Sequence, residues 1–538
     1  MDLLQIRDEA WSASQFAHSR IREEWRIYHN NNYEDNQRVL QDMVPRAKRS
    51  LNPMIQKGIL RLVSPFMEQA ARMEVQSDRS DAVEDDIIFV QDLNNWLEMM
   101  ESADNETETL RTLILHNLVS GMSFAKTYFD PRTRIMRSEA VHPLSIAVDG
   151  GASRIDLSDA MCVAQQFCHD EFFLRRHYDW VPKRKTHVFR TEPTRFNAPT
   201  HRLDELWIRR DMLEDCTDVD SARLENDDKQ MFRAVLIDDE VVEIRSTPFW
   251  WPDFPFAAWR NFSASHDERK AQDFWGFGYG TLLSPQQMFL DEMLATLVAI
   301  ARNMPTGQAV VTRGTLDREQ QYNLDGQVIE LAQGKDMTDF QKLPIDQIPP
   351  VFGEMISYIS QVMQEQMPSL SEVFTGESPG SNSSGRAIAS LQFAAFTQLS
   401  ANLKEMNEFR KRRVQQRLTG IQQTAKKPLS SHIWRGGLDL PDYFPEEPRY
   451  IGFDIVAADA SSMPHSPAGK LEVVQALAAM GYVMPLEEML KFVGFDTGYG
   501  LTPDMFQQMP MADGSSPLAG GVTQMNMGTM MGTEAPLP

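Results

Sequence analysis

A long run without glycine or proline is the feature that most constrains the fold of this chain. Neither residue occurs between residues 386 and 419, so nothing in this run interrupts a helix. A helix of that length extends roughly 50 Å at 1.5 Å per residue. Its apolar side chains keep the three- and four-residue spacing of one helix face, at Ile388, Leu391, Ala395, Leu399, Met406 and Phe409.

Two shorter helices bracket a small insert that precedes this run. Ser284, Pro285 and Gln287 have the signature of a helix start, with an N-cap residue, a first-turn proline and a capping-box glutamine. This helix should stop before Pro305, and a second helix should begin near Pro350. The insert contains two strand candidates, residues 308–311 and 327–331.

The first half of the chain divides into a helical part and a mixed part. Residues 1–120 read as helical, and a helix that follows Asn52 has apolar side chains at Ile55, Ile59 and Leu62. The pattern then changes to short runs typical of strands, at residues 124–129, 135–141, 161–167, 203–208, 231–237 and 241–244. The expected fold class is therefore mainly α, with a mixed α+β middle.

Length and charge limit what the chain can do. Its 538 residues exceed what one hydrophobic core supports, and its net charge of −23 disfavours a general nucleic-acid binder. Three cysteines are too few for a disulfide framework and suit a reducing cytoplasm. The N-terminus has no secretory pattern, and the richest apolar segment, residues 288–301, is too short and too charged to span a bilayer.

Two motifs imitate enzyme sites. The G-x-S-x-G pattern around Ser378 matches a nucleophile elbow, but Pro379 has no N–H to contribute to an oxyanion hole. Residues 380–387 have the glycine spacing of a P-loop, but Arg386 replaces its lysine and Ala387 its Mg²⁺-binding hydroxyl. We therefore expect neither catalysis nor a cofactor, and a hydrolase built on Ser378 is a remote alternative.

Further glycines and cysteines also have structural explanations. Gly276, Gly278 and Gly280 lack the register of a dinucleotide-binding loop and predict a hinge. The spacing of Cys162 and Cys168 fits no zinc module, so buried thiols near a strand are expected and no metal site.

One dense basic cluster lies within the long helical run, at Arg410, Lys411, Arg412 and Arg413. Such a cluster can bind nucleic acid or phosphate. More often, a charged run is the solvated face of a helix.

The order of these parts, taken with three segments, resembles the portal proteins of tailed bacteriophages. The segments are LHNLVSGMSFAKTYFDP at residues 115–131, GFGYGTLLSPQQMFLDEM at residues 276–293 and SGRAIASLQFAAF at residues 384–396. None is a catalytic fingerprint. The two bracketing helices and the long helix also carry more apolar surface than one subunit easily covers, which favours association.

The resemblance implies a portal-type subunit of a closed cyclic ring, built from wing, stem, clip and crown. It assigns the parts in order: the helical wing 1–120, the α+β wing 121–275, the first stem helix 276–304, the clip 305–349, the second stem helix 350–368, the tunnel loop 369–385, the long wing and crown helix 386–427, the crown 428–500 and a disordered tail 501–538.

The resemblance also implies a non-enzymatic function in the virion. The subunit would be assembled in the host cytoplasm into a ring, expected to be a dodecamer, at one capsid vertex. Double-stranded DNA would pass through it without sequence-specific contacts during packaging and ejection. The implied partners are the terminase large subunit, a tail adaptor protein, and the major capsid and scaffolding proteins, with no membrane. Another ring-forming connector or a minor capsid protein is the alternative.

Three groups of residues become candidate sites under this resemblance. The loop residues expected to line the channel are Glu377, Ser378, Ser381, Asn382 and Ser383. The clip residues expected to contact terminase or adaptor are Arg313, Asp317, Arg318 and Glu319. The basic cluster at residues 410–413 is expected to form ion pairs between subunits, or else to contact DNA. The negative charge either keeps the DNA from sticking in the channel or only keeps a large assembly soluble.

Overall fold

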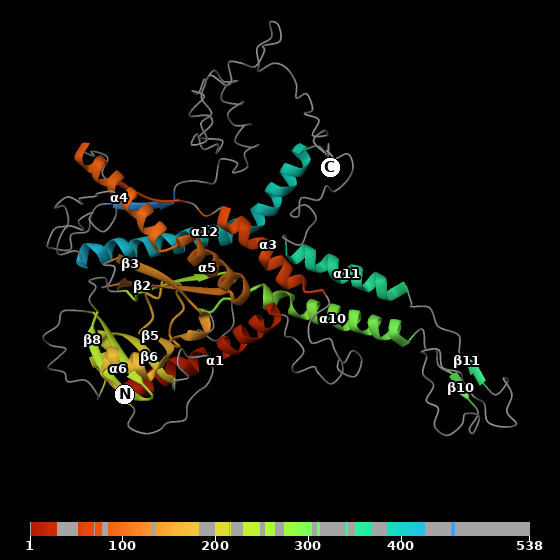
Figure 1. Cartoon of the computed structure of the whole chain (residues 1–538). Coiled ribbons are helices and arrows are strands. Elements are labelled where there is room, and N and C mark those ends of the chain that lie inside the picture. Colours follow the sequence, from red (N-terminus) through yellow and green to blue (C-terminus); the bar gives the residue numbers. More distant parts are fainter. Residues whose placement is uncertain are drawn as a thin grey trace, which may run out of the picture. The chain divides into compact units, whose positions relative to one another are not determined.

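The computed structural model describes most of the chain up to residue 457 (Figure 1). The chain divides into two compact units, Met1–Ala460 and Ser461–Pro538, and all described residues belong to the first. They are residues 2–29, 52–68, 70, 72–77, 84–130, 135–181, 200–214, 216, 230–247, 253–263, 274–303, 309–311, 340–342, 350–367, 385–424 and 453–457.

Among the described residues, four helices precede the main sheets: α1 (Leu3–Tyr28), α3 (Met54–Glu68), α4 (Glu84–Ala103) and α5 (Glu106–Ser120). A capping box fixes the start of α1, because the Asp2 carboxylate accepts from the Gln5 N–H at 2.6 Å and the Gln5 side chain accepts from the Asp2 N–H at 3.1 Å. Gly121 ends α5 in the left-handed conformation, with φ of 71°.

One strand interrupts the part of the chain expected to be helical. Strand β1 (Met73–Ser77) pairs antiparallel with β12 (Phe453–Ala457), which lies nearly 400 residues further along the chain. A strand of five residues is too short to give a clear alternation, and its partner is too distant in sequence to be inferred locally.

Two antiparallel sheets form the mixed part of the fold. The first has the order β3-β2-β9, from β2 (Met122–Asp130), β3 (Ile135–Val141) and β9 (Phe256–Arg260). The second runs in sequence order through β4 (Ile146–Val148), β5 (Cys162–Asp170), β6 (Thr200–Arg209), β7 (Met231–Ile237) and β8 (Glu240–Ser246). All six predicted strands are present, whereas β4 and β9 were not predicted.

Short helices complete the mixed region: η1 (Pro143–Ser145), α6 (Glu171–Tyr178) and α7 (Arg210–Glu214). The start of α1 covers the five-stranded sheet, where Leu3, Ile6 and Ala10 pack with Ala164 and Leu206 in one buried cluster. Helix α1 therefore joins this sheet to the helices that follow.

Two paired helices and a short strand pair follow the sheets. Helices α10 (Tyr279–Asn303) and α11 (Pro350–Gln366) lie side by side, and we call them the stem (Figure 1). Between them, β10 (Ala309–Val311) pairs antiparallel with β11 (Phe340–Lys342). The first predicted strand of the insert is confirmed. The second, residues 327–331, lies outside the described residues.

The start predicted for the first stem helix is wrong. Helix α10 begins at Tyr279, and Pro285 lies inside it rather than in its first turn. Ser284 is therefore not the N-cap. Tyr279 and Leu283 are buried among the surrounding helices, and this tertiary packing outweighs the hydrogen bond that Pro285 cannot donate.

Helix α12 (Gly385–Thr424) is the long helix that the sequence predicts, and it continues through Gly420. A side chain at Gly420 would lie 2.3 Å from the Met136 Cε of β3, so glycine allows the close contact there. Within the described residues, no helix is both long and apolar enough to cross a membrane.

The fold predicts opposite effects for two glycine substitutions in the stem region. A Cβ at Gly278 would lie 2.1 Å from the Val119 carbonyl oxygen, whereas one at Gly353 on α11 would meet no atom within 4 Å. Gly278→Ala should therefore lower the free energy of unfolding by about 3 kcal/mol, and Gly353→Ala should raise it by about 0.5–1 kcal/mol. Denaturant unfolding of the full chain measures both. Equal effects would contradict the packing described.

Candidate functional site

The stem helices meet the rest of the subunit at a crossing of two backbones. A Cβ at Gly121 would lie 2.1 Å from the Phe277 carbonyl carbon, and one at Gly276 would lie 2.7 Å from the Gly121 carbonyl oxygen. Together with the contact of Gly278 on Val119, this leaves no room for side chains. We call residues 274–283, at the start of α10, the stem root. Its glycines permit close packing, and the hinge expected from the sequence stays a prediction.

A buried carboxylate from α1 caps the stem root. Glu24 is 1% exposed, and its Oε1 accepts hydrogen bonds from the Gly278 N–H at 3.1 Å and from the Thr281 hydroxyl. Burial raises the pKa of Glu24, while Thr281 and Arg20 oppose that shift. Arg20, one turn earlier on α1, donates to the Gly276 carbonyl oxygen. A carboxylate at a helix N-terminus satisfies free N–H groups and interacts favourably with the helix dipole.

A second cap connects the stem with α3. The Gln287 side-chain oxygen accepts from the Met54 N–H at 3.0 Å and from the Ile55 N–H at 3.4 Å, at the first turn of α3. Its amide nitrogen donates to the Asn52 carbonyl oxygen at 3.0 Å and to the Asp291 carboxylate at 3.0 Å. The sequence predicts Gln287 as the capping-box residue of its own helix, whereas in the structure its side chain caps α3.

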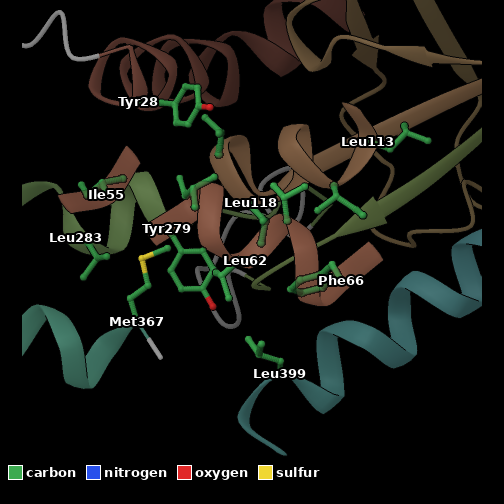
Figure 2. Packing of buried hydrophobic residues seen from close by; sticks show 14 of the residues in the cluster. Tyr28, Ile55, Leu62, Phe66, Leu113, Leu118, Tyr279, Leu283, Met367 and Leu399 are labelled. Carbon is green, nitrogen blue, oxygen red and sulfur yellow. The ribbon is translucent and has the colours of Figure 1, made fainter. Parts of the chain in front are cut away.

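Buried apolar side chains from six helices enclose these polar contacts. Figure 2 shows members of this cluster, among them Tyr28 of α1, Ile55 and Leu62 of α3, Leu118 of α5 and Tyr279 of α10. Met367, directly after α11, and Leu399 of α12 belong to the same cluster. The start of α10, the end of α11 and the long helix α12 are therefore anchored in one core.

The basic cluster of α12 lies largely inside the subunit. Arg413 is 2% exposed and forms a bidentate pair with the Glu106 carboxylate of α5, at 2.6 and 2.9 Å. One turn further on, Arg417 pairs with Asp104 at 2.6 Å and with Glu106 at 3.2 Å. Arg410 is also buried and lies 3.9 Å from Glu101. These arginines fasten α12 to the end of α4 and the start of α5.

The charges of this network stabilise one another. Burial alone would raise the pKa of Glu106, but Arg413 and Arg417 overcome that effect and hold the pKa below its ordinary value of 4.5. Burial lowers the pKa of Arg410, and Glu101 and Glu106 oppose that shift. Bidentate pairing with a guanidinium favours the charged carboxylate strongly.

Arg410 and Arg413 lie beside carboxylates of their own subunit, and their expected contacts with a neighbouring subunit or with DNA stay a prediction. Arg412 donates to the Ile155 carbonyl oxygen at 3.1 Å, also within the subunit. Contacts of Lys411 and Arg412 with another molecule stay a prediction. Sequence reasoning missed Arg417, although its spacing of four residues from Arg413 places both on one helix face.

The remaining predicted residues have different outcomes. The loop residues Glu377, Ser378, Ser381, Asn382 and Ser383, and the clip residues Arg313, Asp317, Arg318 and Glu319, lie outside the described residues. Cys162 is buried as expected, and Cys216 is buried too, but Cys168 is exposed. Cys168 lies on the same face of β5 as Cys162, and burial decreases toward the end of this strand. Across the described ranges, no group of three or more His, Cys, Asp or Glu side chains could hold a metal ion.

The chain has the features of a structural subunit built around an anchored helical stem, and comparisons with known proteins agree. The family described as "Phage P22-like portal protein" matches residues 4–430. The chain therefore belongs to the P22-like phage portal protein family. Portal proteins are structural and non-enzymatic, so the hydrolase alternative based on Ser378 is not supported.

Other comparisons add little to this assignment. No curated protein matches the chain significantly in sequence. One similar solved structure is titled "Neck of empty GTA particle computed with C6 symmetry". It is 12% identical, the match covers 82% of this chain and 90% of that chain, and the TM-score is 0.41. Family membership itself implies a head–tail connector role, a homo-oligomeric ring and a head–tail location in the virion.

The ion pairs of α12 predict a large effect of Arg413→Ala on stability. Removing Arg413 leaves the buried Glu106 carboxylate without its main partner, so the free energy of unfolding should fall by about 3–5 kcal/mol. Lys404→Ala removes an exposed cation from the same helix and should change it by about 0.5 kcal/mol or less. Denaturant unfolding at neutral pH compares the two variants.

The network also predicts a dependence on pH. Because the pKa of Glu106 is lowered in the fold, its stabilisation is complete above its ordinary pKa of 4.5 and is lost as the pH falls through the lowered value. The Arg413→Ala variant should lose less stability than the wild-type chain over this acidic range. An identical pH dependence in both proteins would contradict the assigned pairing.

Proposed function

We propose that twelve copies of this chain close into a ring that conducts double-stranded DNA through one capsid vertex during packaging and ejection. The ring would be assembled in the host cytoplasm and would contact the DNA without sequence specificity. Its partners would be the terminase large subunit, a tail adaptor protein, and the major capsid and scaffolding proteins. Membership of the portal family supports this proposal, and one surface of the stem carries it.

The stem presents apolar side chains that the subunit itself does not cover. On α11, Val351, Met355 and Tyr358 are spaced by four and three residues, and Tyr358 is 68% exposed. This stripe lies beside the buried face of α11, which packs on α10 through Ile359 and Met363. We call Val351, Met355 and Tyr358 the stem stripe. Met288 and Phe289 of α10 are also exposed.

An apolar stripe on a helix that already has an apolar packing face favours contact with another molecule. In a ring, each subunit meets two neighbours through two different surfaces. The stem stripe of one copy would then face the stem of the next copy, where the exposed side chains of α10 are available. Ring closure would bury the stripe and the side chains that it meets.

The stem stripe predicts that Tyr358→Glu prevents ring formation. A carboxylate in the buried interface would lack a partner, and its desolvation should weaken each contact by several kcal/mol. Native mass spectrometry should then find the single chain of 61.4 kDa instead of the twelvefold assembly. Ser357→Glu changes an exposed neighbour on the opposite flank of α11 and should leave the ring intact. Rings of unchanged stability in Tyr358→Glu would contradict this role of the stripe.

We further propose that the clip insert, residues 305–349, contacts terminase and adaptor. The paired strands β10 and β11 lie between the two stem helices in sequence, and this arrangement supports an insert presented at the far end of the stem. Replacing Arg313, Asp317, Arg318 and Glu319 with alanine should leave ring assembly intact and reduce DNA packaging by terminase. If the variant assembled poorly but the rings that did form packaged DNA normally, the insert would have a structural role and would not be the contact for terminase.

We also propose that the loop of residues 369–385 lines the channel. Its small polar side chains, including Ser378, Ser381, Asn382 and Ser383, can contact DNA only weakly, and copies of Glu377 around the axis would repel phosphates. Glu377→Lys should therefore slow DNA translocation and make its rate more dependent on salt. Single-molecule packaging at two salt concentrations measures this. Unchanged rates at both would place the loop away from the DNA.

A further inference from the structure

Three histidines surround one tryptophan where α1 meets α5 and the end of β3. The ring centroid of Trp25 lies 5.7 Å from His116 of α5, 5.2 Å from His142 and 5.5 Å from His29. The rings of His116 and His142 are 5.0 Å apart. Trp25 belongs to α1, His116 to α5, and His142 follows β3 as the N-cap of η1. These ring contacts therefore hold α1 against α5 and the end of β3.

The contacts require neutral histidines. His142 Nδ1 accepts a hydrogen bond from the Leu144 N–H at 3.2 Å and thereby caps η1. A protonated Nδ1 would be a donor and could not accept this bond. His116 is 8% exposed, and its neighbours in the cluster are aromatic rings. Protonation of either ring would place a charge beside the other and in a largely apolar setting.

The surrounding charges do not favour protonation. Burial, with a smaller contribution from the neighbouring His142, lowers the pKa of His116 to about 3. A hydrogen bond with the Val141 backbone opposes this shift. Burial also lowers the pKa of His142, and His29 adds to it. No carboxylate of the described residues opposes either shift.

The other titratable groups nearby are cations or face elsewhere. Arg22 of α1 acts on His18, whose pKa is lowered mainly by burial, and Arg111 of α5 acts on Tyr28. Glu24, the residue before Trp25 on α1, is bound to the stem root. Because its pKa is raised in the fold, the effect of Glu24 on stability changes with pH in the direction opposite to that of the histidines.

We propose that Trp25, His116 and His142 form an acid-sensitive latch that holds α1 against α5 and β3, and through Glu24 and Arg20 secures the stem root. Protonation of the latch loosens α1, and the stem root then loses the carboxylate and the guanidinium that α1 supplies. The latch is complete within one subunit, so it does not depend on the proposed role of the ring.

The sign of the pH dependence follows from the lowered pKa values. Both histidines are neutral in the fold and take up protons near pH 6.5 once released. Stability from the latch is therefore complete above about pH 6.5 and is lost as the pH falls below it. His116, whose pKa is lowered to about 3, should raise the equilibrium constant for opening about tenfold per pH unit in that range, and His142 adds to this in the same direction.

Hydrogen exchange on the full assembled chain tests the latch. Between pH 7.5 and 5.5, after correction for the intrinsic exchange rate, the protection of α1 and of the first turn of α10 should fall by about tenfold from His116 alone, and His142 should increase this loss. The double variant His116→Phe, His142→Asn cannot titrate there, while Asn retains an acceptor for the Leu144 N–H. Its protection should fall less than that of the wild type between pH 7.5 and 5.5, because only the contribution of His18 of α1, whose pKa is also lowered by burial, is retained among these three histidines.

His177→Asn provides the matched control, because His177 is an exposed histidine of α6 outside the cluster. It should keep the wild-type loss of protection. If the double variant does not fold, His142→Asn alone should reduce the loss of protection. The latch would be refuted by wild-type protection that is unchanged at pH 5.5, or by a folded variant that loses as much protection as the wild type.

Discussion

The close approach of two backbones at the stem root is the constraint on which the arrangement of the subunit depends. Because Gly121, Gly276 and Gly278 carry no side chains, the end of α5 can touch the segment that starts α10. That contact places the N-terminus of α10 within reach of Glu24, and places Gln287 at the start of α3. Two helix starts are thus capped by residues distant in sequence, and the stem is held by hydrogen bonds as well as by the apolar core.

The distribution of charge follows from how the subunit is fastened together. Arg413 and Arg417 of α12 form buried ion pairs with Glu106 and Asp104. Cations buried in this way cannot attract DNA phosphates. The net charge of −23 is therefore carried by the other charged residues of the chain. A surface of that sign disfavours lasting contact with a polyanion, as the proposed function of a DNA conduit requires.

Sequence patterns predicted the elements better than their connections. The long helix α12, the stem helices and the strands from β2 to β8 have strong periodicity or clear boundaries, and most were found. The start of α10 was missed, since burial of Tyr279 and Leu283 extends the helix beyond the limit suggested by Pro285. The pairing of β1 with β12 and the capping by Glu24 depend on contacts between distant residues, which no local pattern records. The basic cluster at 410–413 was read as a surface feature because sequence alone does not reveal that Glu106 lies opposite.

A reconstruction of the purified chain by electron cryomicroscopy tests the account most directly. A closed ring is predicted, with an axial channel and with the stem stripe of each copy, Val351, Met355 and Tyr358, buried against α10 of its neighbour. A monomer at micromolar concentration, or a ring in which α11 faces solvent along this stripe, would contradict it.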